Sequence, residues 1–259
     1  QKIRILYERA WTAYWWYNDF AELSQLYDTI EPLALGQDIV NIGKLFNLHT
    51  VLAACVRAGE FSSTEAKIEQ RTAAIRVDLD QIAADGNRPN SALQARTKLK
   101  FLDIQSAIYA GAPPDPHFNE LKAILTQTEG LSSYPVESTT EIILEIGQYF
   151  TDNQAYDDLF ETVLKIKKER ATKIETGRTL LTRGYQKLRA DKNYEAIVLL
   201  GRSQVYLAVK ENRSEFARAL FGCGLAYETV GLNWSARANI LAALDQVFAD
   251  IGETGMFQV

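Results

Sequence analysis

The chain of 259 residues has few of the side chains on which metal sites and most catalytic sites are built. It has two histidines, His49 and His117, and two cysteines, Cys55 and Cys223, with no Cys-x-x-Cys or His-x-x-x-His spacing. This scarcity excludes the common zinc motifs. His49 and Cys55 lie six residues apart, which places them about 240° apart around a helix and argues against a nucleophilic pair. We expect no catalytic residue, no metal and no cofactor.

Long apolar runs and targeting segments are also lacking. No run of eighteen apolar residues exists, so we expect no transmembrane helix and no membrane partner. The first residues, QKIRILYERAW, form neither a signal peptide nor a transit peptide and include no methionine. Both cysteines lie on apolar helical patterns, which predicts buried thiols in a reducing compartment. We therefore expect a cytoplasmic protein and a sequence that is part of a longer one.

Glycine-rich nucleotide motifs are incomplete. Gly36 and Gly43 outline a phosphate-binding loop, but six residues separate them and Leu45 stands where a Ser or Thr would meet magnesium. Gly222-Cys-Gly224 lacks the third glycine and the preceding strand of a dinucleotide fingerprint. We interpret both as structural features. A helical enzyme is the alternative, and it would require a polar pocket that these patterns do not supply.

The clearest pattern in the chain is a helical hairpin at 215–247. Apolar residues recur at the three-four spacing of a helix face, stop at Val230-Gly231, and begin again at Trp234. Two helices joined by so few residues must lie antiparallel. Gly222 and Gly224 each weaken the first helix by about 1 kcal/mol relative to alanine. That loss is acceptable if the missing side chain lets the second helix approach closely.

This hairpin resembles the tetratricopeptide repeat (TPR) family. The order of large, small and helix-breaking positions in that family is matched by Leu220, Gly224, Tyr227, Gly231, Ala236, Ile240 and Ala243. The final proline of the family pattern is absent. A more loosely spaced match covers Tyr7 to Ile30, where Trp11 replaces a small residue and Asn18-Asp19 forms the turn. The resemblance implies helical-hairpin architecture, and an ordinary helical bundle remains the alternative.

The rest of the chain is also predicted to be helical. We expect a first hairpin at 3–16 and 19–30 that ends at Pro32, and capping boxes that open helices at Ser62, Ser91 and Ser138. The expected helices are 3–16, 19–30, 38–58, 62–84, 91–109, 118–128, 138–150, 154–170, 172–190, 193–209, 214–230 and 233–250, with a loop at 131–135. No strand is expected. The fold class is therefore all-α, as a right-handed α-solenoid of about six antiparallel hairpins, a TPR-like superhelix.

One solenoid domain is expected over 1–259. All six prolines lie at or before Pro135, which predicts a bend at 111–135 between an irregular part, 1–110, and a more regular part, 136–259. Gly147, Gly184 and Gly224 are candidates for the small position of successive repeats.

Charge is uneven along the chain. Residues 165–192 contain ten basic and three acidic residues, a local net charge of +7, whereas the whole chain carries −5. One interpretation is a solvated helix face whose cations neutralise acidic neighbours. The other is a surface for an acidic peptide, a phosphorylated ligand or nucleic acid. The acidic chain and the lack of interleaved aromatics make nucleic acid the weaker of these.

The TPR resemblance also implies where a partner binds, because the first helix of each hairpin lines the groove in that family. Transferring the register gives the candidate residues Arg178, Tyr185, Arg189, Arg218, Phe221, Trp15 and Trp16, with Leu181 and Leu188 beside them. Arg178 and Arg218 occupy equivalent positions of consecutive repeats, an arrangement that suits a carboxylate or phosphate. The Lys and Asn residues of the family's chaperone-tail clamp are absent.

We thus expect a non-enzymatic interaction or sensor scaffold module that binds a protein or peptide in its groove, and an acidic ligand is one of the options. The closing stretch AYETVGLNWSARANILAA is also similar to C-terminal sensor repeats of large bacterial multidomain proteins of the STAND type. The alternative is binding of nucleic acid or a phosphorylated ligand through the basic 165–192 face. The ligand, the process served and the oligomeric state stay open.

Overall fold

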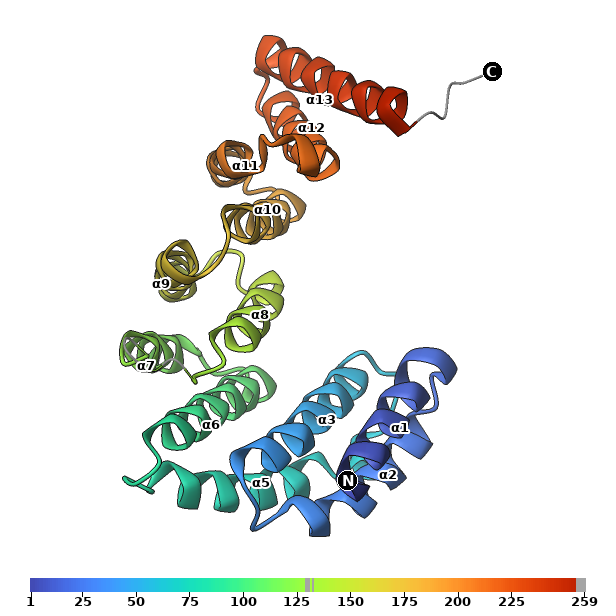
Figure 1. Ribbon diagram of the computed structural model, residues 1–259, viewed down its shortest axis with the longest axis vertical. Coiled ribbons are helices and arrows are strands. Elements are labelled where there is room, and N and C mark those ends of the chain that lie inside the picture. The colour runs from blue at the N-terminus through green and yellow to red at the C-terminus, as the bar shows by residue number, and fades with distance from the viewer. Residues whose placement is uncertain (129–130, 132, 255–259) are drawn as a thin grey trace. The chain divides into compact units, whose positions relative to one another are not determined.

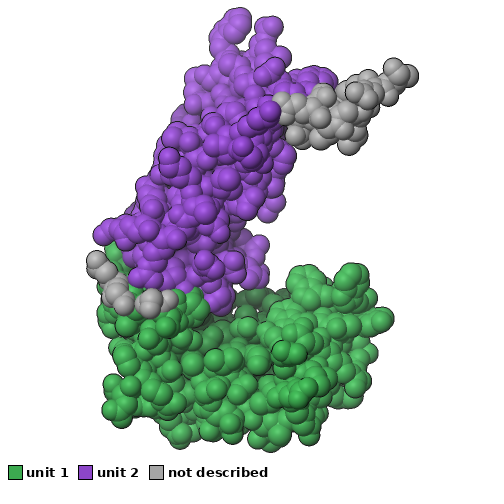
Figure 2. Space-filling view, in the orientation of Figure 1, with its two compact units in different colours: residues 1–135 green, residues 136–259 purple. Residues whose placement is uncertain are grey.

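The protein is described here by a computed structural model, which covers residues 1–128, 131 and 133–254, with the backbone alone for 250–254. Every regular element within these residues is a helix, which confirms the all-α prediction. The chain divides into two compact units, Gln1–Pro135 (unit 1) and Val136–Val259 (unit 2), coloured separately in Figure 2. The prediction of one continuous solenoid with a bend at 111–135 stays a prediction. Residue 132 of the predicted loop lies outside the described residues.

Unit 1 contains helices that pack mainly on their neighbours in the chain. They are α1 (Lys2–Tyr17), α2 (Phe20–Ala34), α3 (Ile39–Arg57), the single turn α4 (Ser63–Ala66), α5 (Ile68–Ala83), α6 (Pro89–Ala110) and α7 (Asp115–Thr126). Helix α2 packs on α1 and α3, α5 packs on α3 and α6, and α7 packs on α6 (Figure 1).

The turn of the first hairpin is formed as predicted. Asn18 ends α1 in the left-handed conformation with φ 49°, and the Asp19 side chain caps α2 by accepting a hydrogen bond from the Glu22 N–H at 2.8 Å. The predicted stop at Pro32 is wrong, because Pro32 lies inside α2, which continues to Ala34. A proline this close to the helix end removes one of its last backbone hydrogen bonds and leaves the others in place.

Helix α3 is the apolar centre of unit 1. Its residues Ile42, Leu45, Leu48 and Leu52 are fully buried. Within the described residues, α3 is the one helix that is long enough and apolar enough to cross a membrane, judged by length and composition alone. Of its apolar eighteen-residue window, 56% is buried inside the protein. Such burial is typical of a core helix, so this feature is weak evidence for a membrane span.

All three predicted capping boxes are wrong. Ser62 precedes only the one-turn helix α4, where its side chain makes no capping hydrogen bond, and the chain then turns at Lys67 with φ 47° before α5 begins. Ser91 lies inside α6, which begins at Pro89, and Ser138 lies inside α8, which begins at Val136. Proline fits the first turn of a helix because its fixed φ suits that position and its missing N–H would be unpaired there anyway. This accounts for the early start of α6.

Unit 2 is also built from helices. It contains α8 (Val136–Ile146), the short 3-10 turn Gly147–Tyr149, α9 (Gln154–Arg170), α10 (Lys173–Arg189), α11 (Asn193–Leu207), the 3-10 turn Lys210–Asn212, α12 (Arg213–Thr229) and α13 (Asn233–Thr254). Helices α10 to α13 pack in chain order, each on the next (Figure 1). The helix predicted at 138–150 ends at Ile146 and continues only as the 3-10 turn. A capping box does exist, but at Thr172 and Glu175 before α10.

Two glycines set the distance between paired helices in unit 2. A Cβ at Gly184 would stand 2.7 Å from Leu200 Cδ2, and a Cβ at Gly224 would stand 2.7 Å from Ile240 Cγ1. Glycine is therefore required for the close approach of α11 to α10 and of α13 to α12, as predicted for Gly224. Both contacts span sixteen residues (200 − 184 and 240 − 224), so the two hairpins share one register. Gly222 differs, because a Cβ added there would stand 3.0 Å from the Tyr185 ring of α10, in the preceding hairpin.

Each unit contains a buried arginine that stacks on a tyrosine and pairs with the following aspartate. In unit 1, Arg71 lies 4.3 Å from the Tyr27 ring centroid and donates to Asp28 Oδ1 at 2.7 Å. Here a lysine, Lys67, also pairs with the same aspartate. The dipeptide Tyr-Asp on one helix and the arginine on a later one thus tie two hairpin segments together.

In unit 2 the same arrangement joins α9 to α10. Arg183 lies 4.5 Å from the Tyr156 ring centroid and donates to Asp157 Oδ1 at 2.7 Å. Lys187 donates to Asp157 Oδ2 at 2.7 Å and also pairs with Glu195. Arg183 and Lys187 have side chains exposed by only 0% and 2%. Buried cations need such partners, because an unpaired charge in the protein interior is strongly destabilising.

From the burial of His49 we expect the stability of the protein to decrease in acid. It is fully buried on α3, and its Nε2 atom lies 2.9 Å from Thr72 Oγ1. Burial, the largest cause, lowers the pKa of His49 to about 4, whereas an unfolded histidine titrates near pH 6.5. The unfolded chain therefore binds more protons between those values. We expect the free energy of unfolding to fall by up to about 3 kcal/mol through this window as pH decreases.

Urea unfolding at a series of pH values checks this expectation. His49→Gln should flatten the pH dependence between about pH 4 and about pH 6.5. His117→Gln, which replaces the half-buried histidine of α7, should keep the slope contributed by His49. An unchanged slope in His49→Gln would contradict the assignment.

Candidate functional site

Unit 2 contains a groove of about 510 Å³ formed by α8, α10 and α12. Helix α10 forms its centre with Arg178, Leu181, Thr182, Tyr185, Gln186 and Arg189. Helix α8 contributes Glu141, Leu144 and Glu145, with Gln148 of the following 3-10 turn, and α12 contributes Glu215 and Arg218. Each of these helices is the first of a pair, so the groove follows a single set of equivalent helices.

The structure brings four of the predicted candidates together. Arg178, Tyr185, Arg189 and Arg218 all line the groove, although they were assigned from two separate hairpins. Leu181 lines it as well. These predicted residues therefore line one groove, and their role in binding stays a prediction.

The other three candidates lie outside this groove. Phe221 is 46% exposed on α12 but does not line the groove. Trp15 and Trp16 belong to α1 of unit 1, and both are exposed, by 68% and 81%. The Trp15 ring stacks on Trp11, with centroids 6.3 Å apart and planes 17° apart. Leu188, predicted beside Arg189, packs against the apolar core of unit 2.

Arg178 already has an acidic partner within the protein. Its Nε atom donates to both carboxylate oxygens of Glu215, at 2.9 Å and 2.8 Å. The prediction of Arg178 and Arg218 as a matched pair for one carboxylate is therefore weakened, because α12 itself supplies a carboxylate to Arg178. The pair joins α10 to α12 at one end of the groove.

Tyr185 is the structural centre of the groove. Its hydroxyl donates to the Arg218 carbonyl oxygen at 2.7 Å, and the Arg218 guanidinium carbon lies 5.8 Å from the ring centroid. Burial raises the pKa of Tyr185, while the charges of Arg218 and Arg189 act in the opposite direction. Both arginines thus lie near the ring. The backbone contact of Tyr185 with α12 and the packing of Gly222 against its ring fix the ring between the two helices.

Four of the ten cations of the basic stretch 165–192 pair with acidic residues outside it. Arg178 pairs with Glu215, Arg183 with Asp157, Lys187 with Asp157 and Glu195, and Lys192 with Asp152. Two of these cations are buried and cannot reach a ligand. These four of the ten basic residues neutralise acidic neighbours, and the interpretation of the stretch as a whole stays a prediction.

The walls of the groove carry opposite charge. Glu141 and Glu145 are exposed on α8, whereas Arg189 and Arg218 are exposed on α10 and α12. Within the described part of the chain, none of these four side chains has an ion pair within 4 Å. With the Arg178–Glu215 pair added, the groove lining contains three arginines and three glutamates.

Sequence reasoning missed the acidic wall. Glu141 was assigned to a capping box that does not form, and Leu144, Glu145 and Gln148 were not considered as lining residues. The available signal was the helical spacing of Glu141, Leu144 and Glu145, which places these three residues on one face of α8. It was obscured because α8 begins two residues earlier than predicted.

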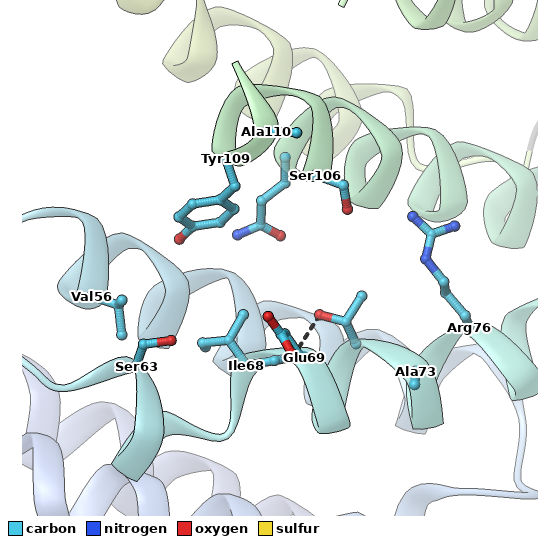
Figure 3. A pocket seen from close by; sticks show the side chains of 11 residues that line it. Val56, Ser63, Ile68, Glu69, Ala73, Arg76, Ser106, Tyr109 and Ala110 are labelled. Atoms are coloured by element: carbon cyan, nitrogen blue, oxygen red, sulfur yellow. Dashed lines mark hydrogen bonds between the residues drawn. The ribbon is translucent and has the colours of Figure 1, made fainter. Parts of the chain in front are cut away.

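Unit 1 contains a second cavity, of about 590 Å³, between α5 and α6 near the end of α3 (Figure 3). Val56 and Ile68 give it an apolar surface, while Glu69, Arg76 and Tyr109 lie around it. Two of these polar groups are already engaged, because Arg76 pairs with Asp103 at 2.7 Å and the Tyr109 hydroxyl donates to the Ala53 carbonyl at 2.8 Å. None of the predicted site residues lines it.

The residues that could bind a metal are dispersed. No group of three or more His, Cys, Asp or Glu side chains suited to a metal ion is found in the described ranges. Cys55 and Cys223 are buried and unbonded to each other, as predicted for free thiols. His49 is a core histidine, which matches the structural interpretation of its apolar setting.

The groove of unit 2 is therefore the candidate site that gathers four of the predicted residues, and its lining combines apolar residues with side chains of both charges. Comparison with protein-family models, with curated protein sequences and with solved structures finds no significant match.

Proposed function

We propose that the chain is a TPR-like interaction or sensor module that binds a protein segment in the groove of α8, α10 and α12. The observation that carries the proposal is the convergence of Arg178, Tyr185, Arg189 and Arg218 on one groove. These residues come from two hairpins, and one alignment of the hairpins with the TPR pattern selected all four. A right-handed α-solenoid is the arrangement that makes such equivalent helices line one face.

The shared register of unit 2 supports the repeat architecture. The Gly184–Leu200 and Gly224–Ile240 contacts occupy equivalent places. The left-handed residues Asp191 (φ 57°) and Gly231 (φ 78°) also occupy equivalent places between paired helices, forty residues apart (231 − 191). A drifting TPR-like repeat accounts for both, and we propose this class of fold together with a cytoplasmic sensor or scaffold role.

The composition of the groove favours a protein segment over nucleic acid. Leu144, Leu181 and Tyr185 offer apolar surface, and the charged residues of the lining are balanced in sign. Nucleic-acid surfaces rely on an excess of basic side chains to displace counterions from the phosphates. Here the buried and paired cations of 165–192 reduce that excess. No enzymatic role is proposed, since the groove presents no nucleophile with an adjacent base.

Blocking the groove tests the proposal. Thr182 is exposed on α10 within the groove, so Thr182→Trp should fill it without disturbing the core. Peptides enriched from a random display library on the unchanged protein should lose at least about tenfold in affinity for this variant. Thr229→Trp is the matched control, because Thr229 is exposed at the end of α12 away from the groove.

Four outcomes are informative. Loss with Thr182→Trp alone supports the proposal. Equal binding by both variants contradicts it, and so does a library that yields no ligand. Enrichment of single-stranded RNA or DNA on the unchanged protein, with affinity that falls steeply with salt, would favour the nucleic-acid alternative instead.

A further inference from the structure

The charges of the groove have a fixed order from one helix to the next. Glu141 and Glu145 are exposed on α8, one helical turn apart, and therefore project on the same side of that helix. Their carboxylates form no ion pair with any side chain of the described residues. They are available to a cation from outside the chain.

The side of the groove formed by α10 and α12 has two cations that likewise form no ion pair with the described residues. Arg189 and Arg218 are exposed and have no acidic partner within 4 Å in the portion that the structure describes. Arg178 differs, because Glu215 occupies its Nε edge at 2.8 Å and 2.9 Å. The unpaired positive charge therefore lies around the Tyr185 ring, over which Arg218 extends.

The groove also has apolar lining residues. They are Leu144 of α8 and Leu181 of α10, the helices that carry the glutamates and Tyr185. Gln186 donates to the Leu144 carbonyl oxygen at 2.7 Å, which holds α8 against α10. The Tyr185 hydroxyl bond to Arg218 holds α10 against α12 in the same way. The order of the three surfaces is thus fixed by contacts within the unit.

We infer that the groove is selective for a protein segment of mixed charge, with a basic side chain over α8, an apolar side chain over Leu181 and Tyr185, and an acidic side chain between Arg189 and Arg218. The inference rests on the proposed function and specifies the partner that this function would take. Neighbouring helix axes lie about 8–10 Å apart. The three helices therefore span about 20 Å, the length of roughly six extended residues.

This order of charge explains why neither a wholly acidic nor a wholly basic segment fits. An acidic segment gains from Arg189 and Arg218 but places a carboxylate against Glu141 and Glu145. A basic segment gains from Glu141 and Glu145 but places a cation against Arg189 and Arg218. Opposed like charges disfavour binding and so reject the wrong partner, which is how charge patterns usually supply specificity.

Charge reversal on each wall provides the test. Peptides are selected from one random display library on three forms of the whole chain: the unchanged protein, Glu141→Lys/Glu145→Lys, and Arg189→Glu/Arg218→Glu. The unchanged protein should enrich peptides with one basic and one acidic residue about four positions apart around an apolar residue, because the acidic side chain lies between α10 and α12. The first variant should enrich peptides with two acidic ends, and the second variant peptides with two basic ends.

Single charge reversals outside the groove control for the position of the change. Glu169→Lys on α9 and Arg237→Glu on α13 change exposed residues that do not line the groove. These variants should keep the preference of the unchanged protein, and peptides of mixed charge should bind the wall variants about tenfold more weakly than the controls. Circular dichroism should show that every variant remains helical.

The failures of the two proposals are distinguishable. In one outcome, all three forms select peptides with the same charge pattern, and these peptides no longer bind Thr182→Trp. That result would overturn the mixed-charge inference and leave groove binding in place. Peptides that bind regardless of Thr182→Trp, or a library without any ligand, would overturn both.

Discussion

Asp157→Asn is expected to lower the free energy of unfolding of unit 2 by about 3 kcal/mol. Asp157 accepts hydrogen bonds from Arg183 and Lys187 at 2.7 Å each, and both cations are buried. Removing one partner of a buried ion pair costs about 3–5 kcal/mol because the remaining charge is left uncompensated. We expect the lower end, since Asp157 is 31% exposed and Lys187 keeps Glu195. Urea unfolding followed by circular dichroism measures the change.

The neighbouring residue provides the control for this substitution. Asp158 is exposed and accepts a hydrogen bond only from Gln154, at 2.8 Å, among the bonds found for its side chain. Asp158→Asn makes the same change of charge on the same helix, and we expect an effect within about 0.5 kcal/mol. Equal destabilisation by the two substitutions would mean that the buried cations do not depend on Asp157.

Gly224→Ala and Gly201→Ala are expected to change stability in opposite directions, although both glycines lie inside helices. Alanine normally stabilises a helix by about 1 kcal/mol relative to glycine. At Gly201 a Cβ meets nothing within 4 Å, so we expect that gain. At Gly224 the Cβ would stand 2.7 Å from Ile240 and 3.3 Å from the Ala236 carbonyl. Overpacking of this kind costs about 1–3 kcal/mol, so the net effect should be destabilising.

A second substitution should restore part of the loss. Ile240→Ala removes the Cγ1 atom that would stand 2.7 Å from the new Cβ and should reduce the penalty of Gly224→Ala in the double variant. Thermal unfolding of the four proteins gives the coupling between the two sites. Additive effects of the two substitutions would show that Ile240 does not set the distance between α12 and α13.

The sequence predicted the helical class well because the apolar spacing is strong in the long helices. Helix α9 was predicted at its observed bounds, 154–170, and α3 ends at the predicted Ala58-Gly59. Helix starts were predicted less well in the proline-containing half. Ser62 and Ser91 match the capping pattern, yet the sharp turn at Lys67 and the proline at the first position of α6 decide where those helices begin.

The site was predictable only in part. The register of the repeat located Arg178, Tyr185, Arg189 and Arg218 on one face, since each lies on a first helix of a pair. It could not show that Glu215 pairs with Arg178, because that contact spans thirty-seven residues and depends on how α10 lies against α12. The burial of Arg183 and Lys187 was missed for the same reason, although the dipeptide Tyr-Asp at 27–28 and 156–157 marks both buried arginine sites.

The most direct test of groove binding is photo-crosslinking from inside the groove. A benzophenone side chain placed at Thr182 in the full chain should form a crosslink to a selected peptide, whereas the same side chain at Thr229 should not. Mass spectrometry of the product identifies the attached peptide residue. Crosslinking from position 182 alone is the result predicted here. Crosslinking from position 229 and none from position 182 would show that the segment binds elsewhere on the protein.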